Sequence, residues 1–401
     1  MSLVVERTSC RTCGGQLAYL MDLGEQLVRW DKPEKAPLVL TKCSRCGLVQ
    51  LRHTVSRDYL FKEGYPYRSG ATQTMRDHLK GIVDDVMKRV ELKPTDIVVD
   101  IGSNDGTLLG FYHVGTRVGF EPSELGKETL LGPLWISDFF STPTFQKFIG
   151  FTKKAKVITA IAMFYDLEDP NAFLQDVKKV LAPDGLFVLQ VNYLPDTLKN
   201  NAVGDICHEH LEYYTLGTLA QLLERNGFLV DGVSFNSING GSVRVFARHH
   251  EYSDTAHNWI QTALEHGETD MDFAAFSLRV STACAKVKGF LMHAKDQNKV
   301  VDIMGASTRG GTFLQAAKID GTVCRFTVER DPSKIGKAYL GTLIVSEDVS
   351  TMNPPDYKLV GPYWFLDEIL TRETRFVNTG GKLIVPLPTP RIIDKDGEHP
   401  L

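Results

Sequence analysis

Residues 96–112 read DIVVDIGSNDGTLLGFY, and the fold of the chain follows from this stretch. An apolar run typical of a buried strand ends at Asp100, a turn with Gly102 and Gly106 follows, and helical spacing begins after the turn. A strand, a glycine-rich turn and a helix in this order bind the charged part of a nucleotide-bearing cofactor. The spacing is looser than the GxGxxG of a pyrophosphate-binding turn, so the residues downstream must identify the cofactor.

Acidic residues follow the next two predicted strands. Glu121 ends the strand at 117–123, 19 residues after Gly102, where a carboxylate can accept hydrogen bonds from both ribose hydroxyls. Asp138 follows the third strand and is placed to accept from an adenine amino group. An acid after each of the first three strands favours S-adenosylmethionine, and a dinucleotide is the alternative. Taken alone, Asp105 is also explained as a helix cap. The predicted cofactor site comprises Asp100, Gly102, Asn104, Asp105, Gly106, Glu121, Pro122, Ser123, Asp138 and Phe139.

Four of the seven cysteines form two CxxC pairs, Cys10 with Cys13 and Cys43 with Cys46, which are 29 residues apart. Each pair presents two thiolates from one tight turn, and two such turns make a tetrahedral site of four sulfurs that suits Zn²⁺. Four thiolates close the coordination shell, so the metal is predicted to be structural. Free core cysteines are the alternative, but they do not account for a repeated CxxC followed by glycine.

Strands alternate with helices on both sides of the quoted stretch, as in a doubly wound sheet. An amphipathic helix is predicted at 215–228, with Thr215 as its N-cap. After Glu251 the sequence is helical to about Asp296, and a second α/β unit begins with NKVVDIMGASTRGGTFLQAAKI at 298–319.

The chain is therefore predicted to be an α/β protein with two Rossmann-like doubly wound units preceded by a small zinc-binding domain. Its 401 residues are too many for one ordinary domain. The expected domains are a zinc-binding domain at 1–74, a cofactor-binding Rossmann-like domain at 75–250, and a helical linker with a second Rossmann-like domain at 251–401.

Composition and charge exclude several classes of protein. With 43% hydrophobic and 23% charged residues, the chain is typical of a soluble globular protein with a full core. A formal net charge of −4 gives no general attraction to nucleic acid or to anionic membranes. No apolar run is long enough to span a bilayer, and the first residues lack a signal sequence. The CxxC pairs suggest metal binding in a reducing compartment instead of disulfide bonds. Together, these features predict a cytoplasmic protein.

Residues 206–214, ICHEHLEYY, concentrate groups that transfer protons, bind metals or act as nucleophiles. The stretch follows the fifth predicted strand, and ligands of an open α/β sheet bind at the carboxyl ends of the strands. We therefore expect it to lie beside the cofactor. An acid–base centre is the favoured interpretation. A metal site at His208 and His210 and a plain hydrogen-bonded loop are the alternatives.

The order of motifs along the chain resembles that of the sugar C-methyltransferase family. The motifs are CxxC…CxxC, DIGSNDG, HEH, GASTRGGT and GGKLIVPLP, and the resemblance covers essentially the whole sequence. The resemblance implies an N-terminal zinc-binding domain, a central class I methyltransferase domain and a C-terminal Rossmann-like domain that helps to hold a nucleotide-linked 4-keto-deoxysugar.

The resemblance also implies roles for individual residues. His210 is implied to be the base that removes a proton beside a keto group, with Glu209 and His208 orienting it or sharing the proton. Histidine suits this task because its ordinary pKa lies near neutrality. The family has a tyrosine in place of Cys207 and often a histidine in place of Tyr165. Tyr165 is therefore a candidate to supply the phenol that Cys207 lacks.

Seven further residues are candidate contacts of the substrate. The resemblance implies that the aromatic segment EGYPYRSGATQTM at 63–75 covers the active site, so its two tyrosines are candidates; interdomain packing is the alternative. The turn SINGGSVRV at 237–245 could approach a sugar, or serve only as a turn. GASTRGGT at 305–312 could offer backbone amides and a guanidinium to a diphosphate. Glu329, 24 residues after Gly305, lies in a ribose-binding position. A Rossmann unit with a purely structural role is the alternative. The candidates are Tyr65, Tyr67, Ser242, Ser307, Arg309, Glu329 and Lys334.

The sequence thus predicts an S-adenosylmethionine-dependent C-methyltransferase for branched-deoxysugar biosynthesis. The enzyme is expected to deprotonate a carbon next to the keto group of a nucleotide-linked keto-deoxysugar and to methylate that carbon. An O- or N-methyltransferase on the same scaffold and a nucleotide-sensing binding module are the alternatives. A sensor would not need a base beside the cofactor, and this counts against the binding module.

Overall fold

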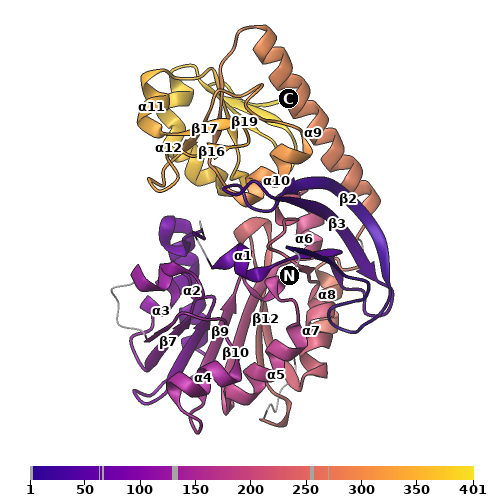
Figure 1. Ribbon diagram of the computed structural model, residues 1–401, viewed down its shortest axis with the longest axis vertical. Coiled ribbons are helices and arrows are strands. Elements are labelled where there is room, and N and C mark those ends of the chain that lie inside the picture. The colour runs from indigo at the N-terminus through magenta and orange to yellow at the C-terminus, as the bar shows by residue number, and fades with distance from the viewer. Residues whose placement is uncertain (1–2, 63, 66, 129–133, 253–256, 270) are drawn as a thin grey trace.

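The computed structural model describes residues 3–62, 64–65, 67–128, 134–252, 257–269 and 271–401. Two α/β units lie one above the other along the long axis, and the strands of the N-terminal module lie beside the place where they meet (Figure 1). The long helix α9 (Phe273–Asp296) runs along the C-terminal unit. Among the described helices, none has the length and apolarity needed to cross a bilayer.

The central unit is built on a seven-stranded sheet with the order β12-β13-β10-β9-β6-β7-β8. All strands are parallel except β13, which runs antiparallel to both of its neighbours. The predicted strand–turn–helix stretch supplies β6, at the point where the chain order reverses and ligands bind. The strands are β6 (Ile97–Ile101), β7 (Thr116–Phe120), β8 (Leu134–Ile136), β9 (Ala155–Ile161), β10 (Leu181–Asn192), β12 (Phe228–Asn236) and β13 (Ser242–His249).

Helices cover both faces of this sheet. On one face, apolar side chains of α2 and α3 pack against inward residues such as Val98 and Val188. On the other, α4, α5 and α7 pack against residues such as Val99 and Leu189. Thr215 caps α7 as predicted, because its hydroxyl accepts a hydrogen bond from the backbone N–H of Thr218 at 3.0 Å. The helices are α2 (Gln73–Met87), α3 (Thr107–Gly110), α4 (Thr142–Ile149), α5 (Pro170–Val180), α6 (Leu194–Lys199), α7 (Leu216–Arg225) and α8 (Trp259–Glu265).

The C-terminal unit confirms the second predicted Rossmann-like sheet. Its eight strands have the order β16-β17-β15-β14-β18-β19-β20-β21, and the five from β17 to β19 are parallel. The strands are β14 (Val301–Met304), β15 (Phe326–Glu329), β16 (Ala338–Tyr339), β17 (Thr342–Ser346), β18 (Tyr357–Val360), β19 (Lys382–Val385), β20 (Arg391–Asp394) and β21 (Gly397–Pro400). The helices are α10 (Thr308–Ala316), α11 (Glu347–Met352) and α12 (Leu366–Asn378).

The N-terminal module contains a four-stranded sheet of order β11-β4-β3-β2, and one of its strands comes from far along the chain. That strand is β11 (Glu212–Tyr213), which pairs with β4. It comes just after His208, Glu209 and His210, here called the HEH segment. The other elements are β1 (Val4–Glu6), β2 (Leu17–Leu27), β3 (Lys35–Cys43), β4 (Val49–Leu51), β5 (His53–Val55) and α1 (Arg57–Phe61). The module's core side chains join both neighbours: Met21 and Leu40 pack with the C-terminal unit, and Leu48 packs with the central unit.

Candidate active site and metal centre

The glycine turn after β6 lies close against the next strand and the loop after β9. The N–H of Gly102 donates to the carbonyl of Phe120 at 2.9 Å, and Gly102 has a φ of +70°. A Cβ at Gly102 would lie 3.1 Å from Cγ of Met163. Both the left-handed backbone and this contact favour glycine, so the turn has the close backbone approach that a nucleotide site needs.

Glu121 lies at the corner of this turn. One carboxylate oxygen accepts the N–H of Asn104 at 2.8 Å, and the other accepts the N–H of Ser123 at 2.9 Å. After the neighbouring strand β8, Asp138 is exposed, with Phe139 next to it. The structure thus places both acids at the carboxyl edge of the sheet, where the sequence predicted cofactor-binding groups.

Asp100 lies below the turn, in the interior of the sheet. The hydroxyl of Thr159 donates to its carboxylate at 2.5 Å, and Asp100 is only 4% exposed. Burial raises the pKa of Asp100 to about 7. This acid is therefore bound to β9 inside the sheet, and its contact with a cofactor stays a prediction.

The segment that joins the N-terminal module to α2 is hydrogen-bonded to the turn. The side-chain amide of Asn104 donates to the carbonyl of Tyr67 at 3.0 Å and accepts the N–H of Ser69 at 2.9 Å. The carboxylate of Asp105 accepts the N–H of Gly70 at 2.8 Å. Asp105 also accepts from the N–H and hydroxyl of Thr107 in a local turn. The N-cap of α3 is Gly106, so the helix-cap interpretation of Asp105 is wrong. The linking segment is thereby held over the turn.

His210 has a defined tautomer. Its Nδ1 lies 2.8 Å from the backbone carbonyl oxygen of Asp205, which can only accept a hydrogen bond, so Nδ1 carries the proton and Nε2 the lone pair. The ring lies against Tyr165, with ring centroids 4.2 Å apart. His210 is buried, and burial lowers its pKa to about 3. The imidazole is therefore neutral, with one free lone pair, throughout the neutral pH range.

Glu209 lies between the central and C-terminal units. The hydroxyl of Thr308, at the start of α10, donates to Glu209 Oε1 at 3.3 Å. Burial raises the pKa of Glu209 to about 7, and the neighbouring Arg29 opposes part of that rise. Near neutral pH this carboxyl can therefore either hold or release a proton.

Because of this environment, Glu209 should make stability depend on pH. Its pKa rises from 4.5 to about 7 on folding, so the native state holds the proton more tightly. The stability contribution is complete below pH 4.5 and is lost as the pH rises through 7. When the pH is raised from about 5 to about 8, the free energy of unfolding should fall in both proteins. We expect the fall to be smaller by about 2 kcal/mol in Glu209→Gln than in the unchanged protein. Urea unfolding at both pH values measures this, with the exposed Glu265→Gln as control, and parallel losses in all three proteins would contradict the assignment.

Cys207 and His208 face the N-terminal module. Together with Trp30 they line a small cavity between β2 and α10. Both ring nitrogens of His208 lie among the backbone of Gln26 and Ala36 without a hydrogen bond of good geometry, and burial lowers the pKa of His208 to about 4. The surroundings of the His208 ring thus differ from those of the His210 ring, which contacts Asp205 and Tyr165.

The alternative of a metal site in the HEH segment gains no support. Among the described residues, only the four N-terminal cysteines bring three or more histidine, cysteine or carboxylate ligand atoms close enough to hold an ion. The acid–base interpretation of the segment and the plain hydrogen-bonded loop both remain.

In the C-terminal unit, Glu329 repeats the position of Glu121. One carboxylate oxygen accepts the N–H of Ala306 at 3.0 Å, and the other accepts the N–H of Arg330 at 2.8 Å. Here a cation also binds the acid, because Lys334 Nζ lies 3.2 Å from the carboxylate and 2.9 Å from the carbonyl of Ala306. The C-terminal unit therefore has the strand–turn–helix arrangement of a Rossmann fold after β14, here called the Rossmann-type corner. The positive charge of Lys334 balances part of the negative charge of its acid, Glu329.

Arg309 has partners other than a diphosphate. Its guanidinium forms an ion pair with Asp205 and donates to the carbonyl of Asn239 at 2.6 Å. Burial lowers the pKa of Arg309, while nearby phenols, first that of Tyr363 and then that of Tyr165, raise it. Arg309 therefore lies at the meeting point of the modules, close to the proposed base.

The remaining substrate candidates are placed as follows. Ser307 caps α10, and its hydroxyl accepts the N–H of Gly310 at 3.1 Å. The hydroxyl of Ser242 donates to the carbonyl of Ile238 at 2.9 Å, as in a plain turn. Tyr67 is 46% exposed, and the ring of Tyr65 contacts Phe61, with centroids 5.5 Å apart. Of this group, Ser307 belongs to the Rossmann-type corner and Tyr67 to the segment over the glycine turn.

Sequence reasoning missed Asp205, Thr308 and Arg29 as neighbours of the HEH segment. Asp205 contacts His210 through its backbone carbonyl, which leaves no signal in the sequence. Thr308 lies in the quoted GASTRGGT motif, which could have pointed to it. Arg29 is fully buried in the N-terminal module, and a buried arginine cannot be recognised without the fold.

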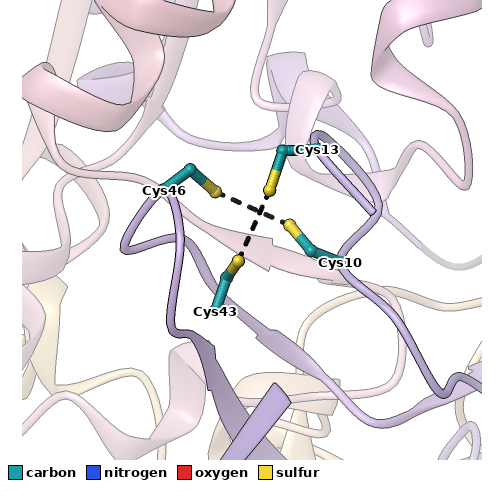
Figure 2. A group of neighbouring side chains, drawn as sticks. All are labelled: Cys10, Cys13, Cys43 and Cys46. Carbon is teal, nitrogen blue, oxygen red and sulfur yellow. Dashed lines mark hydrogen bonds between the residues drawn. The ribbon is translucent and has the colours of Figure 1, made fainter. Parts of the chain in front are cut away.

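The four N-terminal cysteines converge on one point (Figure 2). Their sulfur atoms all lie within 4.8 Å of one another, with Cys10 and Cys46 3.6 Å apart and Cys13 and Cys43 3.4 Å apart. Zinc–sulfur bonds of about 2.3 Å in a tetrahedron separate the sulfurs by about 3.8 Å, so the spacing fits Zn²⁺. A Cβ at Gly15 would lie 2.8 Å from the sulfur of Cys43, so only glycine fits there without displacement.

Comparisons with known proteins agree on the type of enzyme. A family model described as a methyltransferase domain matches residues 74–232, and one described as a C-methyltransferase C-terminal domain matches residues 237–388. C-methyltransferase NovU of Streptomyces niveus is 31% identical over 371 residues, which cover 90% of this chain and 88% of NovU.

Two solved structures show a partial likeness. The plantazolicin methyltransferase BpumL in complex with SAH has a TM-score of 0.34 and 14% identity, covering 43% of this chain and 82% of its own. The mitomycin 7-O-methyltransferase MmcR has a TM-score of 0.34 and 16% identity, covering 44% and 54%. The two family models and the identity with NovU along nearly the whole chain identify the protein: it is a methyltransferase and belongs to the C-methyltransferase family.

Proposed function

We propose that this chain transfers a methyl group from S-adenosylmethionine to a carbon next to the keto group of a nucleotide-linked keto-deoxysugar, in branched-deoxysugar biosynthesis. The observation that carries the proposal is the tautomer of His210: a buried neutral imidazole with Nδ1 bound to the carbonyl of Asp205 leaves Nε2 free to accept a proton. A methyl acceptor that is a carbon acid needs such a base, and a binding module does not.

We assign His210 and Tyr165 different roles in the proposed reaction. His210 takes the proton through Nε2, and the enolate oxygen needs a donor close by. Tyr165 is the proposed donor, because its ring lies against His210 and burial raises its pKa well above the usual range, so the phenol keeps its proton. Burial lowers the pKa of His210 to about 3, and the negative charge of the enolate offsets the cost of charging the buried imidazole. When bound, S-adenosylmethionine supplies an electrophilic methyl group.

The glycine turn and its acids are the proposed cofactor site. Glu121 would accept the ribose hydroxyls and Asp138 the adenine amino group, while Gly102 permits the close approach of the ligand. The acidic edge also suits a positively charged sulfonium. A dinucleotide fits less well, since the turn lacks the GxGxxG spacing.

The corner after β14 is the proposed site of the substrate's nucleotide. The N-terminus of α10 offers backbone amides to the phosphates, with Ser307 at its cap, and Glu329 lies in the ribose position. Lys334 reduces the negative charge of this corner and could reach a phosphate. The four-cysteine centre is proposed to hold a structural Zn²⁺, because four thiolates leave no open position.

Carbon–hydrogen exchange tests this function. The protein is incubated in heavy water with dTDP- and GDP-linked 4-keto-6-deoxysugars, with and without S-adenosylmethionine, and mass spectrometry follows deuterium and methyl groups. We expect deuterium uptake beside the keto group without the methyl donor, and C-methylation with it. Methylation at oxygen or nitrogen without exchange would replace the proposal by the O- or N-methyltransferase. Nucleotide binding without either reaction would favour the binding module.

A further inference from the structure

The first turn of α10, in the C-terminal unit, holds the segment that precedes the proposed base. The guanidinium of Arg309 donates to the carboxylate of Asp205, and the same nitrogen donates to the carbonyl of Asn239 at 2.6 Å. The Asp205 side chain is 1% exposed and that of Arg309 is 15% exposed. The guanidinium also lies over the ring of Trp364, 4.4 Å from its centroid. The ion pair is thus shielded from water, where the loss of one partner leaves the other charge buried and uncompensated.

Asp205 is bound from three directions. Its carboxylate accepts from Arg309 and, at 3.0 Å, from the hydroxyl of Thr197, while its backbone carbonyl accepts the Nδ1 proton of His210 at 2.8 Å. Next to it, a Cβ at Gly204 would lie 2.6 Å from the carbonyl oxygen of Arg309. The two backbones are therefore in close contact, and the carbonyl that fixes His210 belongs to a residue clamped by another domain.

We propose that Arg309 is a positioning residue of the reaction. It holds Asp205 so that the Asp205 carbonyl keeps the His210 proton on Nδ1 and the lone pair on Nε2. The inference rests on the proposed role of His210, and it gives the C-terminal unit a part in proton transfer in addition to substrate binding. If Arg309 instead bound the diphosphate, its loss would weaken substrate binding and leave the turnover of bound substrate unchanged.

Kinetics of the exchange reaction separate these two roles. Arg309→Gln and Asp205→Asn both break the ion pair, and Asp205→Asn keeps the backbone carbonyl. We expect either change to lower kcat for exchange by about 100-fold, with KM little changed, because a small misplacement of a catalytic group costs this much. The double variant should be no slower than Arg309→Gln alone, since both changes remove one interaction. Arg309→Lys should restore part of kcat.

Arg325→Gln is the matched control. Arg325 lies in the same unit and pairs with the buried Asp302 at 2.7 Å, away from the HEH segment. Its loss should lower stability and leave kcat unchanged. An equal fall of kcat in Arg325→Gln and Arg309→Gln would overturn the proposal in favour of general destabilisation. A rise in KM at constant kcat in Arg309→Gln would overturn it in favour of a diphosphate contact.

A spectroscopic test needs no substrate. The hydrogen-bonded Nδ1 proton of His210 should give a slowly exchanging imidazole resonance, assigned by its absence in His210→Gln. We expect this resonance to shift or exchange faster in Arg309→Gln and Asp205→Asn, and to stay unchanged in Arg325→Gln. An unchanged resonance in Arg309→Gln would overturn the inference. If no candidate sugar reacts but the resonance still responds, the proposed function fails while the positioning role stands.

Discussion

His210→Ala is expected to lower the rate of carbon–hydrogen exchange by about 10²–10⁴-fold, the usual contribution of a general base. The change removes the Nε2 lone pair and leaves Tyr165 in place. Glu209, with its pKa raised to about 7 by burial, is the group left to accept a proton, so a residual rate should follow its ionisation. Deuterium uptake measured by mass spectrometry from about pH 5 to pH 9 gives both the rate and the pH profile.

Cofactor binding should survive this change. The glycine turn and Glu121 are held by hydrogen bonds to Asn104, Ser123 and Phe120, none of which involves His210. Calorimetry should therefore give the same affinity for S-adenosylmethionine in His210→Ala and in the unchanged protein. His113→Ala, which removes an exposed histidine, is the matched control and should keep full activity. Exchange at the full rate in His210→Ala would rule out its role as the base.

Removing the Zn²⁺ proposed for the four-cysteine centre is expected to disorder the N-terminal module and, with it, the segment around His210. A structural Zn²⁺ contributes about 10–16 kcal/mol to folding in zinc-finger peptides, far more than such a small module could replace. The effect should reach the active site because β11 pairs with β4, and because the N–H of Leu51 donates to the carbonyl of Leu211 at 2.9 Å. Strands that lose their partner lose protection from hydrogen exchange.

Hydrogen-exchange mass spectrometry measures this coupling. After chelation, or in Cys43→Ser, peptides covering 36–55 and 205–216 should lose protection together, while those of β14 and β15 keep theirs. Cys324→Ser is the matched control, since it removes a buried cysteine of the C-terminal unit. Zinc release on chelation is counted with a colorimetric dye. If 205–216 stays protected after the metal is lost, the metal does not support the catalytic segment.

The local patterns of the sequence were enough for most of the fold. The stretch at 96–112 became β6, the glycine turn and α3, and GASTRGGT became the start of α10. These elements follow from short-range rules: apolar spacing, glycines that accept positive φ, and capping hydroxyls such as that of Thr215. The four N-terminal cysteines converge as expected, because each CxxC turn by itself brings two thiolates together.

The surroundings of the HEH segment were not visible in the sequence. The strand after it, β11, joins a sheet whose other strands begin at Leu17, and two residues supply too little pattern to be recognised. Arg309 was one of the candidate contacts of a diphosphate, and in the fold its guanidinium is paired with Asp205. Nothing in the local sequence could decide between these partners.

The sequence by itself determined the fold class, the glycine turn with its acids and the two CxxC turns of the four-cysteine centre, because each depends on residues a few positions apart. The role of His210 as the base was implied by the family resemblance and stays a prediction. Only the tertiary structure decided which nitrogen of His210 is free, how burial moves the pKa values of Glu209 and His210, and which domain holds Asp205. The physical reason is that burial and long-range hydrogen bonds join segments far apart in the chain, as for Asp205 and Arg309, 104 positions apart. Such contacts exist only once the three modules have packed together.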